Sequence, residues 1–140
     1  ENIFPVPVSG TPKACASQYE RSIRKFFPKE KPAFDWVLLG IGEDGHTASL
    51  FPGTTVLKEK KKLIREVWLE QKQSWRISFT FPLINKAANV IYLVSGKEKA
   101  GIVSEIIKNK KIKPSLPAQR VRPGKGMLFW MLDEDAAAKI

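Results

Sequence analysis

The chain has 140 residues, of which 43% are hydrophobic, and this length and composition suit one ordinary domain with a real core and argue against disorder. No apolar run approaches the length of a membrane span, and no signal peptide is apparent. The single cysteine, Cys15, permits no internal disulfide, which fits a reducing cytoplasm.

The formal net charge of +10 raises the question of a nucleic-acid partner. Many of the lysines cluster in two connecting stretches, residues 58–62 and 108–113, and neither carries interleaved aromatic residues that could stack on bases. No zinc-ligand or helix-turn-helix pattern occurs. We therefore expect solvated loops and no nucleic-acid partner, while the positive field favours the approach of an anionic ligand.

The chain is predicted to begin with an extended segment and one helix. Pro5 and Pro7 exclude a helix from residues 1–10. Thr11 then provides a helix cap and Pro12 the first helical position. The apolar residues that follow recur at helical spacing to about position 27: Ala14, Cys15, Tyr19, Ile23 and Phe26. This pattern predicts that Cys15 is at least half buried.

The rest of the chain is organised around residues 34–53, FDWVLLGIGEDGHTASLFPG. The apolar run at residues 36–39 suits a parallel strand buried on both faces. A glycine loop follows with Asp44 and the only histidine, His46, and residues 47–51 suit a turn or two of helix. We expect this loop at the carboxyl edge of a sheet, where open α/β folds bind ligands.

The glycine spacing at residues 40–45 also matches a dinucleotide-binding loop, an interpretation that we reject. That fingerprint needs a long helix after the third glycine and an acidic residue ending the next strand. Here Pro52 shortens the helix, and the lysines at residues 58–62 come next. Glu43 and Asp44 would also repel a pyrophosphate.

The remaining sequence predicts strands that alternate with helices, separated by a charged turn at residues 28–32 and a loop at 114–125. We expect strands at residues 63–69, 75–80, 89–94 and 127–132, and helices at 82–88, 97–108 and 133–140. This order implies an α/β fold with a mostly parallel sheet and helices on both faces.

The segment GIGEDGHTASLFPG resembles the signature of the 6-phosphogluconolactonases. The resemblance continues in RISFT at residues 76–80, INKA at 84–87 and VSGKEKA at 94–100, and it covers nearly the whole chain. Related sugar-phosphate isomerases and deaminases share the Gly-x-Gly-x-x-Gly-His core. They continue with Ile-Ala-Phe-Asn-Glu-Pro where this chain has residues 47–52, so the lactonases are the better match.

The resemblance implies hydrolysis of 6-phospho-D-glucono-1,5-lactone to 6-phosphogluconate in the pentose phosphate pathway, without a metal or cofactor. His46 would exchange protons near neutral pH, and Asp44 would orient its imidazole or hold a sugar hydroxyl. Gly42 and Gly45 would contact the substrate, and the amides of residues 45–47, at a helix start, would favour developing negative charge.

Each of these roles has an alternative. His46 could be a structural histidine, and Asp44 could be a turn residue that satisfies the loop's own amides. A Ser49–His46–Asp44 triad can be drawn, but nothing suggests an exposed nucleophile elbow. Asn85 matches an asparagine of the family, although its place also suits a structural hydrogen bond.

Two basic residues match cations that face the substrate in the family. Arg76 begins a strand, and Lys99 lies at the start of a helix that follows a strand. Arginine can hold a phosphate with two hydrogen bonds, whereas lysine offers a mobile point charge. Either residue could instead be a solvated surface residue, and Lys97 competes with Lys99 for the role.

The family's N-terminal half, including its phosphate loop, has no counterpart here. Residues 9–12 resemble a fragment of that loop but are expected to be a helix cap only. We therefore expect residues 1–140 to be a single α/β domain or the C-terminal portion of one lactonase domain. Exposed apolar surface would then favour self-association.

Two alternative functions stay open beside the lactonase. One is an isomerase/deaminase acting on an amino-sugar phosphate, and the other is a non-catalytic fragment that binds a sugar phosphate. For the lactonase and for both alternatives, the expected partner is a small sugar phosphate, the expected location is the cytoplasm, and no membrane association is expected.

Overall fold

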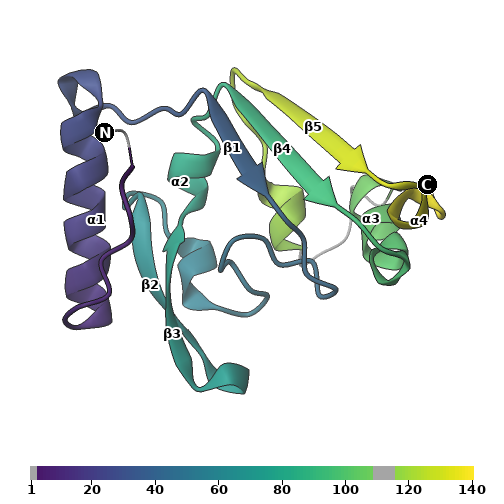
Figure 1. Ribbon diagram of the computed structural model, residues 1–140, viewed down its shortest axis with the longest axis horizontal. Coiled ribbons are helices and arrows are strands. Elements are labelled where there is room, and N and C mark those ends of the chain that lie inside the picture. Colours follow the sequence, from purple (N-terminus) through teal and green to yellow (C-terminus); the bar gives the residue numbers. More distant parts are fainter. Residues whose placement is uncertain (1–2, 109–115) are drawn as a thin grey trace.

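Two sheets form the framework of the computed structural model, which describes residues 3–108 and 116–140 (Figure 1). One is a three-stranded parallel sheet of order β1-β4-β5, and the other is an antiparallel hairpin of β2 and β3. The strands are β1 Trp36–Leu39, β2 Ile64–Leu69, β3 Ser74–Phe79, β4 Asn89–Val94 and β5 Met127–Leu132. The predicted α/β class with a parallel sheet is confirmed. The lysines at 109–113 lie outside the described residues.

The α-helices are α1 Pro12–Phe26, α2 Phe81–Ile84, α3 Ala100–Lys108 and α4 Glu134–Ala137. Short 3₁₀ turns join the elements at Pro28–Glu30, Thr55–Lys58, Glu70–Lys72, Lys97–Lys99 and Pro117–Arg120. Thr11 caps α1 as predicted, because its Oγ1 accepts a hydrogen bond from the Ala14 amide at 3.3 Å. No helix in the described ranges is both long and apolar enough to cross a membrane.

Helix α1 lies against the hairpin rather than against the parallel sheet (Figure 1). The Glu20 carboxylate on α1 accepts hydrogen bonds from the amides of Leu63 and Ile64, at 3.0 and 3.2 Å, where β2 begins. The Tyr19 ring stacks on Phe79 of β3 with ring centroids 6.2 Å apart. On the same helix Cys15 is buried, as its place in the pattern predicted.

Only one face of the parallel sheet is covered by the described residues. Val37, Leu39, Val90 and Tyr92 point into the main core, where α3 also packs. On the other face Trp36 and Leu38 are 55% and 62% exposed. Successive side chains of a strand point to opposite faces, so the expectation that β1 is buried on both faces is wrong for this part of the chain.

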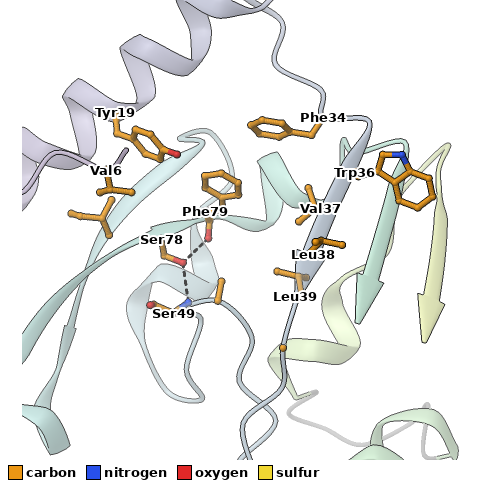
Figure 2. A pocket seen from close by; sticks show the side chains of 13 residues that line it. Val6, Tyr19, Phe34, Trp36, Val37, Leu38, Leu39, Ser49, Ser78 and Phe79 are labelled. Carbon is orange, nitrogen blue, oxygen red and sulfur yellow. Dashed lines mark hydrogen bonds between the residues drawn. The ribbon is translucent and has the colours of Figure 1, made fainter. Parts of the chain in front are cut away.

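A groove of about 480 Å³ separates β1 from the hairpin (Figure 2). Val37, Leu38 and Leu39 line it from β1, and Ser78 and Phe79 line it from β3. Ala48 and Ser49, which follow the glycine loop, also line this groove, and the Ser49 amide bonds to Ser78 on β3.

Asn85 has the structural role that its position allowed. Its side-chain nitrogen donates to the Arg120 carbonyl at 3.1 Å, and its side-chain oxygen accepts from the Arg122 amide at 2.8 Å. These bonds pin the segment after α3 beside α2, because the amide side chain pairs with backbone groups on both sides.

Candidate active site

The carboxyl ends of β1 and β4 bring the glycine loop beside Lys99. The loop leaves β1, the 3₁₀ turn Lys97–Lys99 leaves β4, and the two strands are parallel neighbours. Parallel neighbours end at the same edge of a sheet, and the Lys99 Nζ accordingly lies 3.7 Å from the Glu43 Oε1. Lys99, rather than Lys97, is therefore the lysine that reaches the loop.

Asp44 and His46 form a close pair within the loop. The Asp44 Oδ1 lies 2.6 Å from the His46 Nδ1, and the same oxygen accepts from the His46 amide at 3.0 Å. Asp44 thus acts both as a turn residue and as the partner of the imidazole. With Nδ1 donating to the carboxylate, Nε2 is left as the free acceptor of the ring.

The Asp44 carboxylate is stabilised in its charged form. Partial burial raises the pKa of Asp44, but the hydrogen bonds from the amide and ring of His46 outweigh this effect and leave the pKa below its ordinary value. The carboxylate therefore stays ionised at neutral pH, where it can hold the ring and stabilise a positive charge on it.

Two glycines allow the loop to close on itself. A Cβ at Gly42 would overlap the His46 Nδ1, so a side chain there would displace the imidazole. Gly45 has φ +76°, which favours glycine, and its amide donates to the Gly42 carbonyl at 2.9 Å. The Gly42 amide in turn donates to the His46 carbonyl at 2.9 Å. These amides are satisfied by the loop itself.

The prediction of a short helix at residues 47–51 is wrong. Thr47 and Leu50 form an isolated antiparallel bridge, and Ala48 between them has φ +50°. The Thr47 hydroxyl donates to the Gly40 carbonyl at 2.9 Å, which turns the chain back toward the end of β1. The amides of residues 45–47 therefore do not lie at the start of a helix. The prediction that a helix start stabilises developing negative charge at these amides is wrong.

The turn places an aromatic ring on the imidazole. Phe51 stacks on His46 with centroids 3.9 Å apart and an angle of 22° between the planes. One edge of the ring meets Asp44 and one face meets Phe51, so the orientation of His46 is fixed by two contacts. Sequence reasoning missed Phe51, whose apolar character alone carries no such signal.

A chain of hydrogen bonds connects the loop to a buried tyrosine on β4. The Tyr92 hydroxyl on β4 donates to the Ala118 carbonyl at 3.0 Å, and the Ala118 amide donates to the Gly45 carbonyl at 3.0 Å. Burial raises the pKa of Tyr92, while contact with the Thr47 side chain lowers it by a smaller amount. Tyr92 was predicted only as part of an apolar strand, because its partner lies 26 positions away.

Two other candidate residues, Arg76 and Ser49, form no hydrogen bond with His46 in the described part of the chain. Arg76 is exposed on β3, and its Nη1 donates to the Trp75 carbonyl at 3.3 Å. The Ser49 hydroxyl forms no hydrogen bond with His46 among the described residues, so no triad is assembled there. Instead the Ser49 amide donates to the Ser78 Oγ at 3.1 Å.

The loop opens onto a second hollow of about 480 Å³. Asp44, Phe51 and Thr54 line it on one side, and Trp68 and Lys72 line it from the end of the hairpin. This volume is adequate for a small ligand. Within the described residues, no group of three His, Cys, Asp or Glu side chains is arranged to hold a metal ion.

Together the fold and the loop define an α/β protein with an Asp–His pair at the carboxyl edge of a parallel sheet. Such a pair suits proton transfer to a small ligand bound at that edge. The family described as glucosamine-6-phosphate isomerases/6-phosphogluconolactonase matches residues 1–130. The chain belongs to this family, and the resemblance seen in the sequence is confirmed.

Individual relatives agree with this assignment. The 6-phosphogluconolactonase of Synechocystis sp. is 41% identical over 99% of this chain and 58% of its own length. That of Bos taurus is 40% identical over 88% of this chain and 48% of its own length. The solved 6-phosphogluconolactonase from Trypanosoma cruzi is 29% identical with a TM-score of 0.84, over 98% of this chain and 59% of that one.

The chain thus spans about half the length of the curated relatives that it matches.

Proposed function

We propose that the protein containing this chain hydrolyses 6-phospho-D-glucono-1,5-lactone to 6-phosphogluconate, as in the pentose phosphate pathway. The observation that carries the proposal is the Asp44–His46 pair, 2.6 Å apart and on the edge loop. The lactonases of Synechocystis and Bos taurus, each at least 40% identical over the matched residues, support the substrate.

In this mechanism His46 transfers protons twice. The Nε2 of His46 takes a proton from a water molecule, whose oxygen attacks the carbonyl carbon of the lactone. The bond between that carbon and the ring oxygen then breaks, and the imidazolium returns the proton to the ring oxygen, which becomes a hydroxyl. Asp44 holds the Nδ1 proton throughout and stabilises the charged ring.

The phosphate of the substrate requires cations near the loop. Lys99, whose side chain is only 21% exposed and lies against Glu43, supplies one at the edge of the sheet. Arg76, two residues from Ser78 on the same face of β3, is proposed as the second. Gly42 and Gly45 contribute by leaving room for the imidazole and by shaping the surface that the substrate meets.

We also propose that residues 1–140 act as one α/β unit, located in the cytoplasm. The buried, unpaired Cys15 is consistent with a reducing compartment. Neither proposal depends on the identity of the substrate.

The test replaces His46 with glutamine, which keeps polarity but cannot exchange protons at neutral pH. We expect lactone hydrolysis to fall roughly a hundredfold or more, the usual size of general acid–base effects. Folding, followed by circular dichroism, should change little.

The lactone also opens spontaneously in water, so a blank without protein must be subtracted at each substrate concentration. Turnover of His46→Gln within a few-fold of the unmodified protein would exclude His46 from the mechanism. A protein that acts on glucosamine 6-phosphate but not on the lactone would instead establish the isomerase/deaminase alternative.

A further inference from the structure

A buried serine on the hairpin bonds to the turn that follows His46. The Ser78 Oγ donates to the Phe79 carbonyl at 2.8 Å and accepts from the Ser49 amide at 3.1 Å (Figure 2). Ser78 is only 4% exposed. Because the single hydroxyl proton is used toward Phe79, a lone pair is directed at the Ser49 amide, and the contact has a defined direction.

The turn that Ser78 holds is strained. Ala48 has φ +50°, a left-handed conformation that is unfavourable for a residue with a Cβ. Strained backbone persists only where surrounding contacts determine it. Here those contacts include the Thr47 hydroxyl to the Gly40 carbonyl at 2.9 Å, the Leu50 amide to the Thr47 carbonyl at 2.9 Å and the Ser49 amide to Ser78.

The turn matters because Phe51 follows directly after it. The Phe51 ring lies on the His46 imidazole at 3.9 Å, and it can do so only while residues 47–50 reverse the chain. If the turn relaxed to φ below zero at Ala48, Phe51 would leave the imidazole. Among the described residues, Asp44 would then be the only remaining contact that orients the ring.

We propose that Ser78 is a positioning residue for His46. Its hydroxyl holds the Ala48–Ser49 turn in the strained conformation, which keeps Phe51 stacked on the imidazole. In the same way it links the strand that carries Arg76 to the loop that carries His46. The expected effect on catalysis rests on the proposed function, whereas the effect on the geometry of His46 does not.

The geometry can be measured without substrate, because His46 is the only histidine of the 140 residues. Its two ring C–H protons give isolated NMR signals, which His46→Gln identifies by their disappearance. Stacking on Phe51 shifts these signals through the ring current of the phenyl group. Phe51→Leu, which removes that ring, gives the positions expected for an unstacked imidazole.

We expect Ser78→Ala to move the His46 signals most of the way toward those of Phe51→Leu. Turnover of the lactone should fall roughly tenfold with little change in KM, because small misplacements of a catalytic group act mainly on the chemical step. Ser78→Cys, which keeps the volume but is a weak acceptor, gives the same comparison if the alanine variant does not fold.

Two further variants separate positioning from packing. Ser74→Ala, on the same strand and face, removes a buried hydroxyl that has no hydrogen-bond partner among the described residues, and it should leave the His46 signals unchanged. Ala48→Gly removes the left-handed strain, so in the Ser78→Ala background it should move the signals back toward their original positions.

The inference is overturned if Ser78→Ala and Ser78→Cys leave the His46 signals in place, whatever happens to activity. It is also overturned if Ser74→Ala moves them as much as Ser78→Ala does. If the unmodified protein hydrolyses no lactone but Ser78→Ala still moves the His46 signals toward those of Phe51→Leu, the proposed function is contradicted and the assignment of Ser78 stays supported.

Discussion

At the residue scale, short-range geometry brings Asp44 and His46 together in the loop. Gly42 leaves the space that the imidazole fills, Gly45 supplies a positive φ, and Asp44 lies two positions from His46. All of these features lie within five consecutive positions, so local sequence is enough to place them. Lys99 is different, because it follows β4, the neighbour of β1 in the sheet, and contacts Glu43 at the edge of the sheet.

This difference leads to a prediction about phosphate recognition. Lys99→Met should weaken binding of 6-phosphogluconate by about 1.5–3 kcal/mol, the range for a hydrogen bond to a charged group. Binding of unphosphorylated gluconate should hardly change, because it lacks the charge that the lysine meets. Isothermal titration calorimetry with both ligands measures the two effects.

Lys97→Met is the matched control, since Lys97 belongs to the same 3₁₀ turn but forms no ion pair in the described residues. It should leave both affinities within about twofold. Equal losses for gluconate and 6-phosphogluconate in Lys99→Met would mean that the lysine supports the loop rather than binding phosphate.

At the element scale, a single carboxylate organises the entry into β2. The Glu59 Oε1 accepts hydrogen bonds from the amides of Lys60, Lys61 and Lys62 at 2.8–3.0 Å, and its Oε2 lies 2.6 Å from the Arg65 Nη1. The amides of Lys61 and Lys62 make the largest contributions, and they lower the pKa of Glu59 from 4.5 to about 2. The lysine-rich stretch is therefore an ordered turn around a partly solvated negative charge.

A lowered pKa in the folded state means that the ionised form stabilises the fold. The stabilisation is fully present above the unfolded value of 4.5 and is lost as the pH falls toward about 2. Glu59→Gln should therefore lower the free energy of unfolding by about 1 kcal/mol at pH 7, at the lower end for charged hydrogen bonds because the site is partly solvated. The difference should shrink below pH 4.5.

Urea denaturation at several pH values between 7 and 3 measures this dependence. Glu105→Gln on α3 is the control, because that carboxylate has no partner among the described residues. A Glu59→Gln effect that is equally large at pH 7 and pH 3 would show that charge is not its cause.

At the scale of the whole molecule, one face of the parallel sheet and one edge of β1 are open. The described residues leave Trp36, Leu38, Leu93 and Met131 on that face between 48% and 62% exposed. β1 pairs with β4 alone within these residues, so its other edge retains unpaired backbone groups. Apolar faces and free strand edges both favour association.

We therefore predict that the 140-residue chain self-associates through this face. Leu38→Lys combined with Met131→Lys should reduce both the weight-average mass in sedimentation and the binding of an apolar dye, because charges on the face oppose its burial. Val8→Lys changes an apolar residue that is 90% exposed elsewhere, so it should have no such effect. A chain that sediments as a monomer at all concentrations would contradict the prediction.

The sequence by itself determined the order of the strands and placed Asp44 and His46 in one glycine loop. Apolar runs at residues 36–39, 89–94 and 127–132 identified the parallel strands, and the Thr11-Pro12 pair identified the start of α1. These signals are local, since periodicity, caps and turn residues act over a few positions.

Only the tertiary structure decided how the loop is held. Residues 47–51 form a turn rather than a helix, and two of their hydrogen bonds leave the segment: the Thr47 hydroxyl bonds to Gly40, and the Ser49 amide bonds to Ser78, which lies 29 positions away. The approach of Lys99 to Glu43 in the loop, and the exposure of one face of β1, likewise depend on which elements meet in space. Long-range contacts of this kind override local propensity. They cannot be predicted from the local patterns of a single sequence.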